Sequence, residues 1–230
     1  MIQIENVETF GFKAAIHGMR NPLNSWSRSD SEYMPQFDTE YGPMKAEFAI
    51  GENDLKLMQQ LCKAGSDHRK FLRMINVTAD ITAPLYWWKE YDTYKVGTVA
   101  NSCSTMHKLT AKEFTLDDFS CEHLMRDAEG WNIEEEYAEG ESPLAALEYT
   151  IAVLNFYRKR YLETKDKRYW WQLIQLLPSS YNQRRTVQLN YEVLLNMYHS
   201  RKNHKLDEWV NFCKWVETLP YFEAICLFEQ

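Results

Sequence analysis

Residues 158–205 form a strongly basic segment, although the protein as a whole has a formal charge of −7. The segment has a net charge of about +8, because eleven lysines and arginines stand against three acidic residues. Such a local field attracts anions, and the planar guanidinium of arginine matches phosphate and carboxylate groups. The alternative is a solvated charged surface without a ligand. The basic residues are Arg158, Lys159, Arg160, Lys165, Lys167, Arg168, Arg184, Arg185, Arg201, Lys202 and Lys205.

Within this segment the sequence predicts a helix over about residues 184–201 that carries Asn190 and Arg201 on one face. The two residues are eleven positions apart, which is close to three helical turns. An amide and a guanidinium on one face are suited to contact a nucleotide. The alternative is an arginine at the end of a solvated helix.

A second group of residues with possible chemistry is a run of aromatic side chains. These rings could stack on a planar ligand such as a base or a flavin. They could equally belong to the core or to a subunit interface. The residues are Tyr86, Trp87, Trp88, Tyr91 and Tyr94.

Several other chemistries lack their sequence patterns. The chain has no glycine-rich dinucleotide motif, no P-loop and no nucleophile-elbow motif. Its five cysteines are widely spread and lack zinc-ligand spacing, so we expect free thiols and no metal site. Cys103, Ser104 and His107 are close in sequence, but sequence proximity does not make a nucleophile and base.

Composition excludes further classes of function. The negative overall charge argues against non-specific nucleic-acid binding, which needs a broad basic surface. No apolar run approaches the roughly 20 residues of a membrane span. The first residues lack a secretion signal pattern, so we expect a cytoplasmic protein.

The expected elements place these residues in one α+β domain over 1–230 with most helices in the second half. In the first half, strands are expected at 1–10, 45–50 and 71–83, and a long loop at 17–44. A helix over 55–65 is expected to be capped by Asn53 or Asp54.

The second half is predicted from clear start signals and apolar periodicity. Residues 127–141 hold seven acids and no base, which predicts an exposed insertion. Ser142 and Pro143 predict a helix start. A tryptophan-rich helix ending near Pro178 and a helix over 205–219 are also expected.

The segment LPSSYNQRRTVQLNYEVLLNMYHSR resembles the flavin-dependent thymidylate synthases. In that family a Leu-Pro pair is followed by two asparagines and by an arginine that holds the nucleotide. Leu177-Pro178, Asn190, Asn196 and Arg201 match this pattern without a gap.

A second block, HRKFLRMINVTADITAPLYWWKEYDTYKVGTVANSCSTM, is similar to the family's His-x-x-Phe strand and to its signature R-H-R-x-x-S-x-N-E-x-S-x-R-Y. The matching residues are His68, Phe71, Ala83-Pro84, Asn101 and Ser104. The chain departs from the signature where R-H-R falls on residues 94–96 or 93–95, because only Lys95 there is basic. The lost side chains hold flavin and nucleotide phosphates in the family.

The resemblance implies an α+β fold with a mixed sheet and a homotetramer whose sites lie between subunits. It also implies reductive methylation of dUMP to dTMP, with FAD as cofactor and with NADPH and a folate as co-substrates. No side-chain nucleophile is required, since reduced flavin supplies the reducing equivalents.

The resemblance also implies roles for the matched residues. Arg201 is the candidate catalytic residue and contacts the pyrimidine or its phosphate, while Ser104 and Asn101 bind the substrate. The flavin side comprises His68, Lys95, Asn190 and Asn196.

Two other functions stay open, because a fold does not determine a function. One is a non-catalytic protein that sequesters or senses a nucleotide on the same scaffold. The other is a structural subunit of an oligomer, with its aromatic residues buried between chains.

Overall fold

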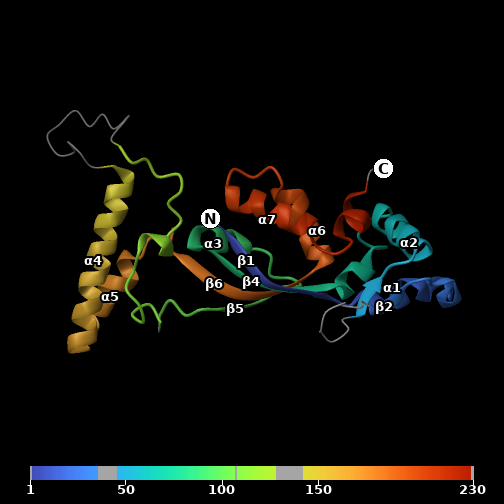
Figure 1. Ribbon diagram of the computed structural model, residues 1–230, viewed down its shortest axis with the longest axis horizontal. Helices are drawn as coiled ribbons and strands as arrows, with labels where there is room; N and C mark the ends of the chain where they lie inside the picture. Colours follow the sequence, from blue (N-terminus) through green and yellow to red (C-terminus); the bar gives the residue numbers. More distant parts are fainter. Residues whose placement is uncertain (1, 36–45, 107, 128–141, 229–230) are drawn as a thin grey trace. The chain divides into compact units, whose positions relative to one another are not determined.

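The computed structural model describes residues 2–35, 46–106, 108–127 and 142–228 (Figure 1). These residues form two compact units, and the chain passes between them several times. Unit 1 comprises residues 1–3, 81–93 and 101–185, and unit 2 comprises residues 4–80, 94–100 and 186–230. The expected acidic insertion at 127–141 lies outside the described residues except for Asp127.

A four-stranded sheet in the order β1-β4-β6-β5 carries residues of both units. Its strands are β1 (Gln3–Phe10), β4 (Asn76–Pro84), β5 (Val99–Ser102) and β6 (Asn182–Asn190). Strands β4 and β6 run antiparallel, since Tyr191 N donates to Ile75 O at one end and Leu85 N to Tyr181 O at the other. The expected strand at 1–10 is confirmed, as is the α+β class with its helical second half. The strand expected at 71–83 is confirmed only from Asn76 onward, because Lys70–Met74 form a 3₁₀ turn.

Strand β6 corrects the expectation of a helix over 184–201. Val187 and Leu189 are buried and alternate with more exposed neighbours, which is the period of two of a strand. The helix α6 therefore begins only at Tyr191 and covers Tyr191–Arg201.

Unit 2 holds α1 (Phe12–Arg20), α2 (Glu52–Lys63), α6 and α7 (Asp207–Glu217), with short helical turns at Lys70–Met74 (η3) and Glu223–Leu227 (η5). Helix α6 packs on α7 and on the η3 turn, and α2 packs on η5. The core residues of this unit include Met58, Leu72, Tyr191, Trp209, Phe212 and Phe222. The helices expected at 55–65 and 205–219 correspond to α2 and α7 and are confirmed.

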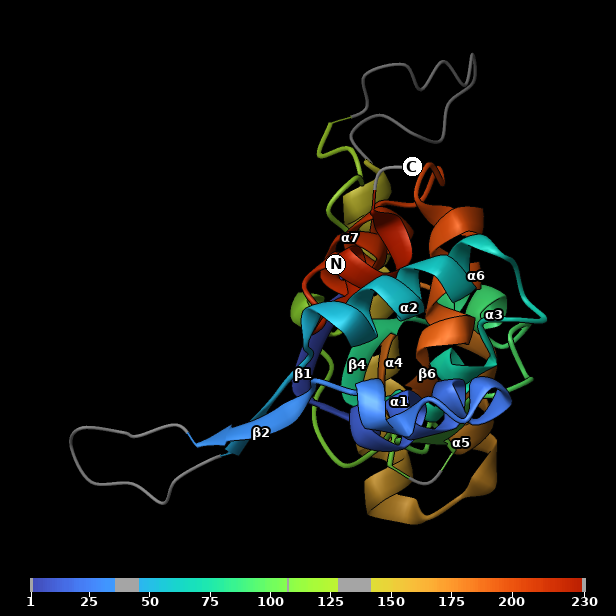
Figure 2. The same cartoon turned by 90° about the vertical axis from the view of Figure 1, so that its right-hand side faces the viewer.

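The long loop expected at 17–44 is wrong for its described part. Residues 17–20 complete α1, because Phe12, Ile16 and Met19 form a buried helical stripe. Two 3₁₀ turns follow at Asn21–Leu23 and Trp26–Arg28. The antiparallel hairpin of β2 (Glu32–Pro35) and β3 (Ala46–Ala49) comes next, and Figure 2 shows β2 leading away from α1 and α2.

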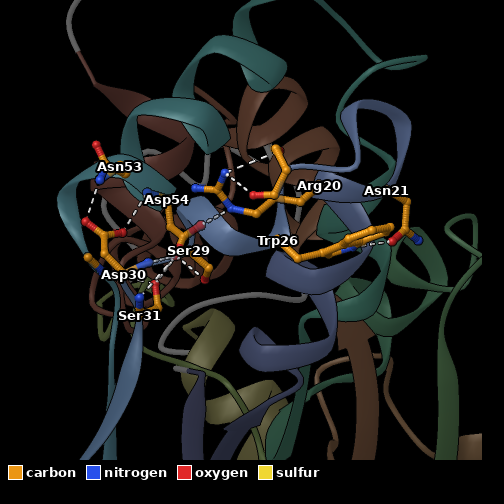
Figure 3. Close-up of polar contacts among 10 residues, drawn as sticks. Arg20, Asn21, Trp26, Ser29, Asp30, Ser31, Asn53 and Asp54 are labelled. Atoms are coloured by element: carbon orange, nitrogen blue, oxygen red, sulfur yellow. Dashed lines mark hydrogen bonds and ion pairs between the residues drawn. The ribbon is translucent and has the colours of Figure 1, made fainter.

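Helix α2 is capped by a side chain from a distant part of the chain. The N-cap residue is Gly51, not Asn53 or Asp54 as expected. The Asp30 carboxylate accepts hydrogen bonds from the backbone N–H groups of Asn53 (2.9 Å) and Asp54 (3.1 Å), as Figure 3 shows. Asp30 thereby satisfies two amides that the helix itself leaves without acceptors.

Asp54 is instead fully buried and forms an ion pair with Arg20 (Figure 3). Its Oδ1 lies 2.6 Å from Arg20 Nε. Its Oδ2 accepts from the hydroxyls of Ser29 and Ser31 and from the backbone amides of Asp30 and Ser31. Burial alone would raise the pKa of Asp54, but hydrogen bonds from Ser31, Ser29 and Arg20 outweigh it and hold the pKa below its usual value. This network ties α1, the following turn and α2 together.

Unit 1 holds α3 (Leu85–Tyr91), α4 (Pro143–Thr164), α5 (Lys167–Leu176) and a 3₁₀ turn at Leu116–Asp118. Helices α4 and α5 pack side by side (Figure 1). Ser142 Oγ accepts from Ala145 N at 3.1 Å, which confirms the predicted helix start. The core that joins these elements comprises Leu109, Phe114, Phe119, Leu147, Ile151, Leu154 and Leu173.

The aromatic run divides between the two units. Trp87, Trp88 and Tyr91 are almost completely buried in unit 1 and pack on one another, so the core interpretation is correct for them. Tyr94 belongs to unit 2.

Two features of the described residues bear on other classes of function. None of their helices is long and apolar enough to cross a membrane. No group of three or more histidine, cysteine or acidic side chains in the described ranges is arranged to hold a metal ion.

Candidate functional site

Arg201 ends α6 and lies beside two aromatic rings of unit 2, those of Tyr94 and Trp209, whose centres are 6.0 Å apart. Its Nε donates a hydrogen bond of 2.9 Å to the Tyr94 hydroxyl. Its guanidinium carbon is 4.8 Å from the centre of the Trp209 ring and 5.6 Å from that of Tyr94. Cation–π contacts of this kind fix a guanidinium in position while it keeps its charge. We call this arrangement of Arg201, Tyr94 and Trp209 the arginine clamp.

Asn190 lies at the other end of the same helix. Its side-chain oxygen accepts a hydrogen bond of 3.1 Å from Val193 N, so Asn190 is the N-cap of α6. The helix has 11 residues and is thus about 16 Å long. Asn190 and Arg201 therefore mark the two ends of α6, and the face between them carries the buried apolar residues Leu194 and Met197.

The segment 94–97 connects these two ends. Tyr94 bonds to Arg201, and Gly97 lies against the side chains of Asn190 and Val193. Gly97 has a φ of +79°, a left-handed conformation that side chains with a Cβ adopt at a cost. The exposed part of this turn includes Lys95, the remaining basic residue of the family signature.

Replacing Gly97 with alanine should destabilise the protein by about 1–2 kcal/mol, the cost of a left-handed alanine. The added Cβ would also lie 3.0 Å from both Asn190 Nδ2 and Val193 Cγ2. The control is Gly65→Ala, where φ is +100° and nothing lies within 4 Å of the added Cβ. Urea unfolding should show a greater loss for Gly97→Ala than for Gly65→Ala. Equal losses in the free energy of unfolding would mean that the contact of position 97 with Asn190 and Val193 does not add to the cost.

His68 lies in the same unit, directly before the η3 turn, and lines a cavity of about 610 Å³. The walls of this cavity are mainly apolar and come from α1, α2 and the η3 turn; they include Met19, Leu57, Leu61, Phe71 and Met74. Arg69 forms an ion pair with Glu192, with Nε 3.0 Å from Oε2, which holds the His68 segment to the first turn of α6. We call this the His68 cavity.

The remaining predicted site residues are Asn196, Asn101 and Ser104. Asn196 is exposed on α6. Asn101, on β5, and Ser104 belong to unit 1, so their placement beside Arg201 stays a prediction. His107 lies outside the described residues, which leaves the proximity of Cys103, Ser104 and His107 without a structural description.

Much of the basic segment is engaged in contacts within the protein, so these residues form neither an open anion site nor a purely solvated surface. Arg185 lies 4.2 Å from the centre of the Trp88 ring and donates to Asp92 and Gln183 within unit 1. Arg168 pairs with Asp166. The segment is also divided between the two units, so its charges do not form one described surface.

Sequence reasoning found Arg201 but missed the role of its partners. Tyr94 was grouped with a run of rings that are mostly core, and Trp209 was not singled out. Residues 94 and 201 are 107 positions apart, so no local pattern could indicate their contact. The available signal was the match of Arg201 to the family pattern.

Comparison with known proteins gives the fold. No family model and no curated protein matches the sequence. Thymidylate Synthase X (ThyX) from Helicobacter pylori, solved with FAD and dUMP, is similar with a TM-score of 0.65 and 16% identity over 98% of this chain and 97% of the other.

The UMP/dUMP methylase PolB from Streptomyces cacaoi, solved with 5-Br UMP, has a TM-score of 0.61 and 16% identity over 99% of this chain and 95% of that one. At this identity the likeness establishes the architecture rather than the activity. The chain shares the fold of the flavin-dependent thymidylate synthases over nearly its whole length.

Proposed function

We propose that the protein binds a uridine-type mononucleotide, dUMP or a close relative, at the arginine clamp. The observation that carries this proposal is the Arg201 guanidinium, which two aromatic rings hold in position at the end of α6. A fixed guanidinium binds a phosphate or a pyrimidine carbonyl without first losing side-chain freedom. Similar folds are known with dUMP or a UMP analogue bound, which supports the choice of nucleotide.

The residues around the His68 cavity are compatible with a flavin ring. A mainly apolar space of about 610 Å³ is within the usual range for a cofactor site, which runs from about 300 to 1,000 Å³. FAD would be held by His68, Asn190, Asn196 and Lys95. When bound, FAD would supply the reducing equivalents for methylation of dUMP to dTMP, with NADPH as reductant and a folate as carbon donor.

In this reaction the chain's own residues would bind and orient the reactants. Arg201 would hold the nucleotide, and Ser104 and Asn101 would form hydrogen bonds with it. The protein would assemble as a homotetramer whose binding sites lie between subunits. This assembly remains part of the proposal.

A second candidate is a non-catalytic protein that sequesters or senses a nucleotide. The difference between this chain and the family signature favours this candidate, because Lys95 is the basic residue that remains where the family has R-H-R. Each lost charge-assisted hydrogen bond costs about 1.5–3 kcal/mol of cofactor binding. The arginine clamp does not depend on that signature.

Two measurements separate the candidates. If the protein is an enzyme, we expect a flavin absorption band after FAD is supplied, together with dUMP-dependent oxidation of NADPH. If it only binds a nucleotide, we expect neither of these signals, but dUMP should raise the melting temperature. A panel of mono-, di- and cyclic nucleotides without any stabilisation would contradict both and favour a structural subunit.

A further inference from the structure

A second cavity in unit 2 lies between α1 and the β2–β3 hairpin and has a volume of about 570 Å³. It uses a different face of α1 from the His68 cavity: Lys13, Ala14, His17 and Arg20 line this one, whereas Gly18 and Met19 line the other. We call it the α1–hairpin cavity. None of the residues assigned to the nucleotide or flavin lines it.

Aromatic rings form two sides of this cavity. The rings of His17 and Trp26 are stacked, with centres 5.8 Å apart and planes 19° apart. Trp26 is held in place by a 2.9 Å hydrogen bond from its Nε1 to Asn21 Oδ1, which Figure 3 shows. The rings of Tyr33 and Phe48, paired across the hairpin, are 5.0 Å apart.

These rings are partly open to solvent although they line a concavity. Trp26 is 42% exposed and Tyr33 is 56% exposed. Aromatic surface in this setting gains most from covering by another flat apolar group. The walls therefore favour a planar ring system.

Three basic side chains line the cavity, those of Lys13, His17 and Arg20. Lys13 lies with its Nζ 6.0 Å from the centre of the Tyr33 ring, and His17 is stacked on Trp26. Arg20 is 97% buried and lines the cavity together with Ser29 and Ser31. Among the described residues that line it, none is acidic. The protein as a whole is acidic, so this basic lining is a local exception.

Arg20 is held rigidly without using all its donors. Its Nε bonds to Asp54, and its Nη1 lies 3.2 Å from Ser25 O; Nη2 makes no hydrogen bond with a described residue. Asp54 is fully buried and does not line the cavity, and five donors already surround its oxygens. A ligand would therefore meet the cationic side of this ion pair.

We propose that the α1–hairpin cavity binds a planar aromatic anion, with its ring between Trp26 and Tyr33 and its acidic group toward Lys13, His17 and Arg20. The volume is within the range for small-molecule sites, and ring stacking and charge pairing act on the same ligand. This site is separate from the arginine clamp, and a ligand there is not a substrate of the proposed reaction.

Isothermal titration calorimetry with 2-naphthoate and with uncharged 2-naphthylmethanol tests the proposal. The wild-type protein should bind 2-naphthoate about tenfold more tightly than the alcohol. Trp26→Ala should weaken both ligands about tenfold, which corresponds to about 1.4 kcal/mol. Lys13→Gln should weaken only 2-naphthoate and so reduce its preference over the alcohol.

Tyr149→Ala is the matched control, because Tyr149 is a 73% exposed ring on α4 of the other unit. It should leave both affinities unchanged, and Trp26→Ala should leave dUMP binding unchanged, so that failure of this proposal is distinguishable from failure of the proposed function. Circular dichroism checks that each variant is folded. Equal binding of the two ligands, unchanged binding by folded Trp26→Ala, or no binding at millimolar ligand would overturn the proposal.

Discussion

Arg201→Ala is expected to weaken dUMP binding about a hundredfold, because it removes a guanidinium that makes charge-assisted hydrogen bonds. Two such bonds contribute about 1.5–3 kcal/mol each, and every 1.4 kcal/mol is about a factor of ten in affinity. The aromatic contacts with Tyr94 and Trp209 hold the guanidinium in position, so little of this energy is spent on ordering it. Isothermal titration calorimetry with dUMP measures the change.

Two variants show whether the effect belongs to the clamp. Arg168→Ala removes an arginine of the same basic segment whose side chain is 83% exposed and pairs with Asp166, and it should leave the affinity unchanged. Tyr94→Phe removes the 2.9 Å hydrogen bond to Arg201 but keeps the ring, so it should weaken binding less than Arg201→Ala. If dUMP binds Arg201→Ala as tightly as it binds the wild type, the clamp is not the nucleotide site.

Asp54→Asn is expected to lower the free energy of unfolding by about 3–5 kcal/mol, the usual result of removing one partner of a buried ion pair. The substitution keeps the size of the side chain but leaves the Arg20 guanidinium, 97% buried, without its carboxylate. In the wild type, two hydroxyls and two backbone amides donate to Asp54 Oδ2. The substitution replaces the carboxylate among these donors with a side-chain amide. Urea unfolding at pH 7 measures the difference.

The difference should depend on pH in a defined direction. The pKa of Asp54 is lower in the folded protein than in the unfolded chain, where it is about 3.9. The stabilisation by the carboxylate is therefore complete above that value and is lost as the pH falls through the folded-state pKa. The difference in the free energy of unfolding between wild type and Asp54→Asn should be constant above about pH 5 and should become smaller in more acidic solution.

Asp166→Asn serves as the surface control for this pair. Asp166 pairs with an exposed arginine, and solvent screens such surface pairs, so Asp166→Asn should destabilise the protein much less than Asp54→Asn. A loss for Asp54→Asn no larger than that for Asp166→Asn would show that the Arg20–Asp54 network does not hold the unit together.

The sequence predicted the elements whose signals are local. Ser142 and Pro143 predicted the start of α4 because a cap and an N1 proline act within one turn. The β-branched residues and alternating pattern of 71–83 predicted β4, which begins at Asn76. Strand β6 was mistaken for helix because its polar residues obscured the alternation of Val187 and Leu189.

Contacts between distant residues could not be predicted in this way. Arg20 and Asp54 are 34 positions apart, and the helix cap that Asp54 might have provided is supplied by Asp30 instead. The clamp brings together three segments, and only Arg201 had a recognisable pattern of spacing. The family resemblance therefore located the candidate site, and the tertiary contacts explain how Arg201 is held.

A crystal structure of the protein with dUMP tests the central claim most directly. We expect the nucleotide to lie at the end of α6, with a phosphate or carbonyl oxygen about 3 Å from a guanidinium nitrogen of Arg201. Soaking with deoxyuridine, which lacks the phosphate, should show which part of the ligand Arg201 contacts. A nucleotide bound elsewhere, with Arg201 still packed against Tyr94 and Trp209 and touching no ligand, would contradict the account.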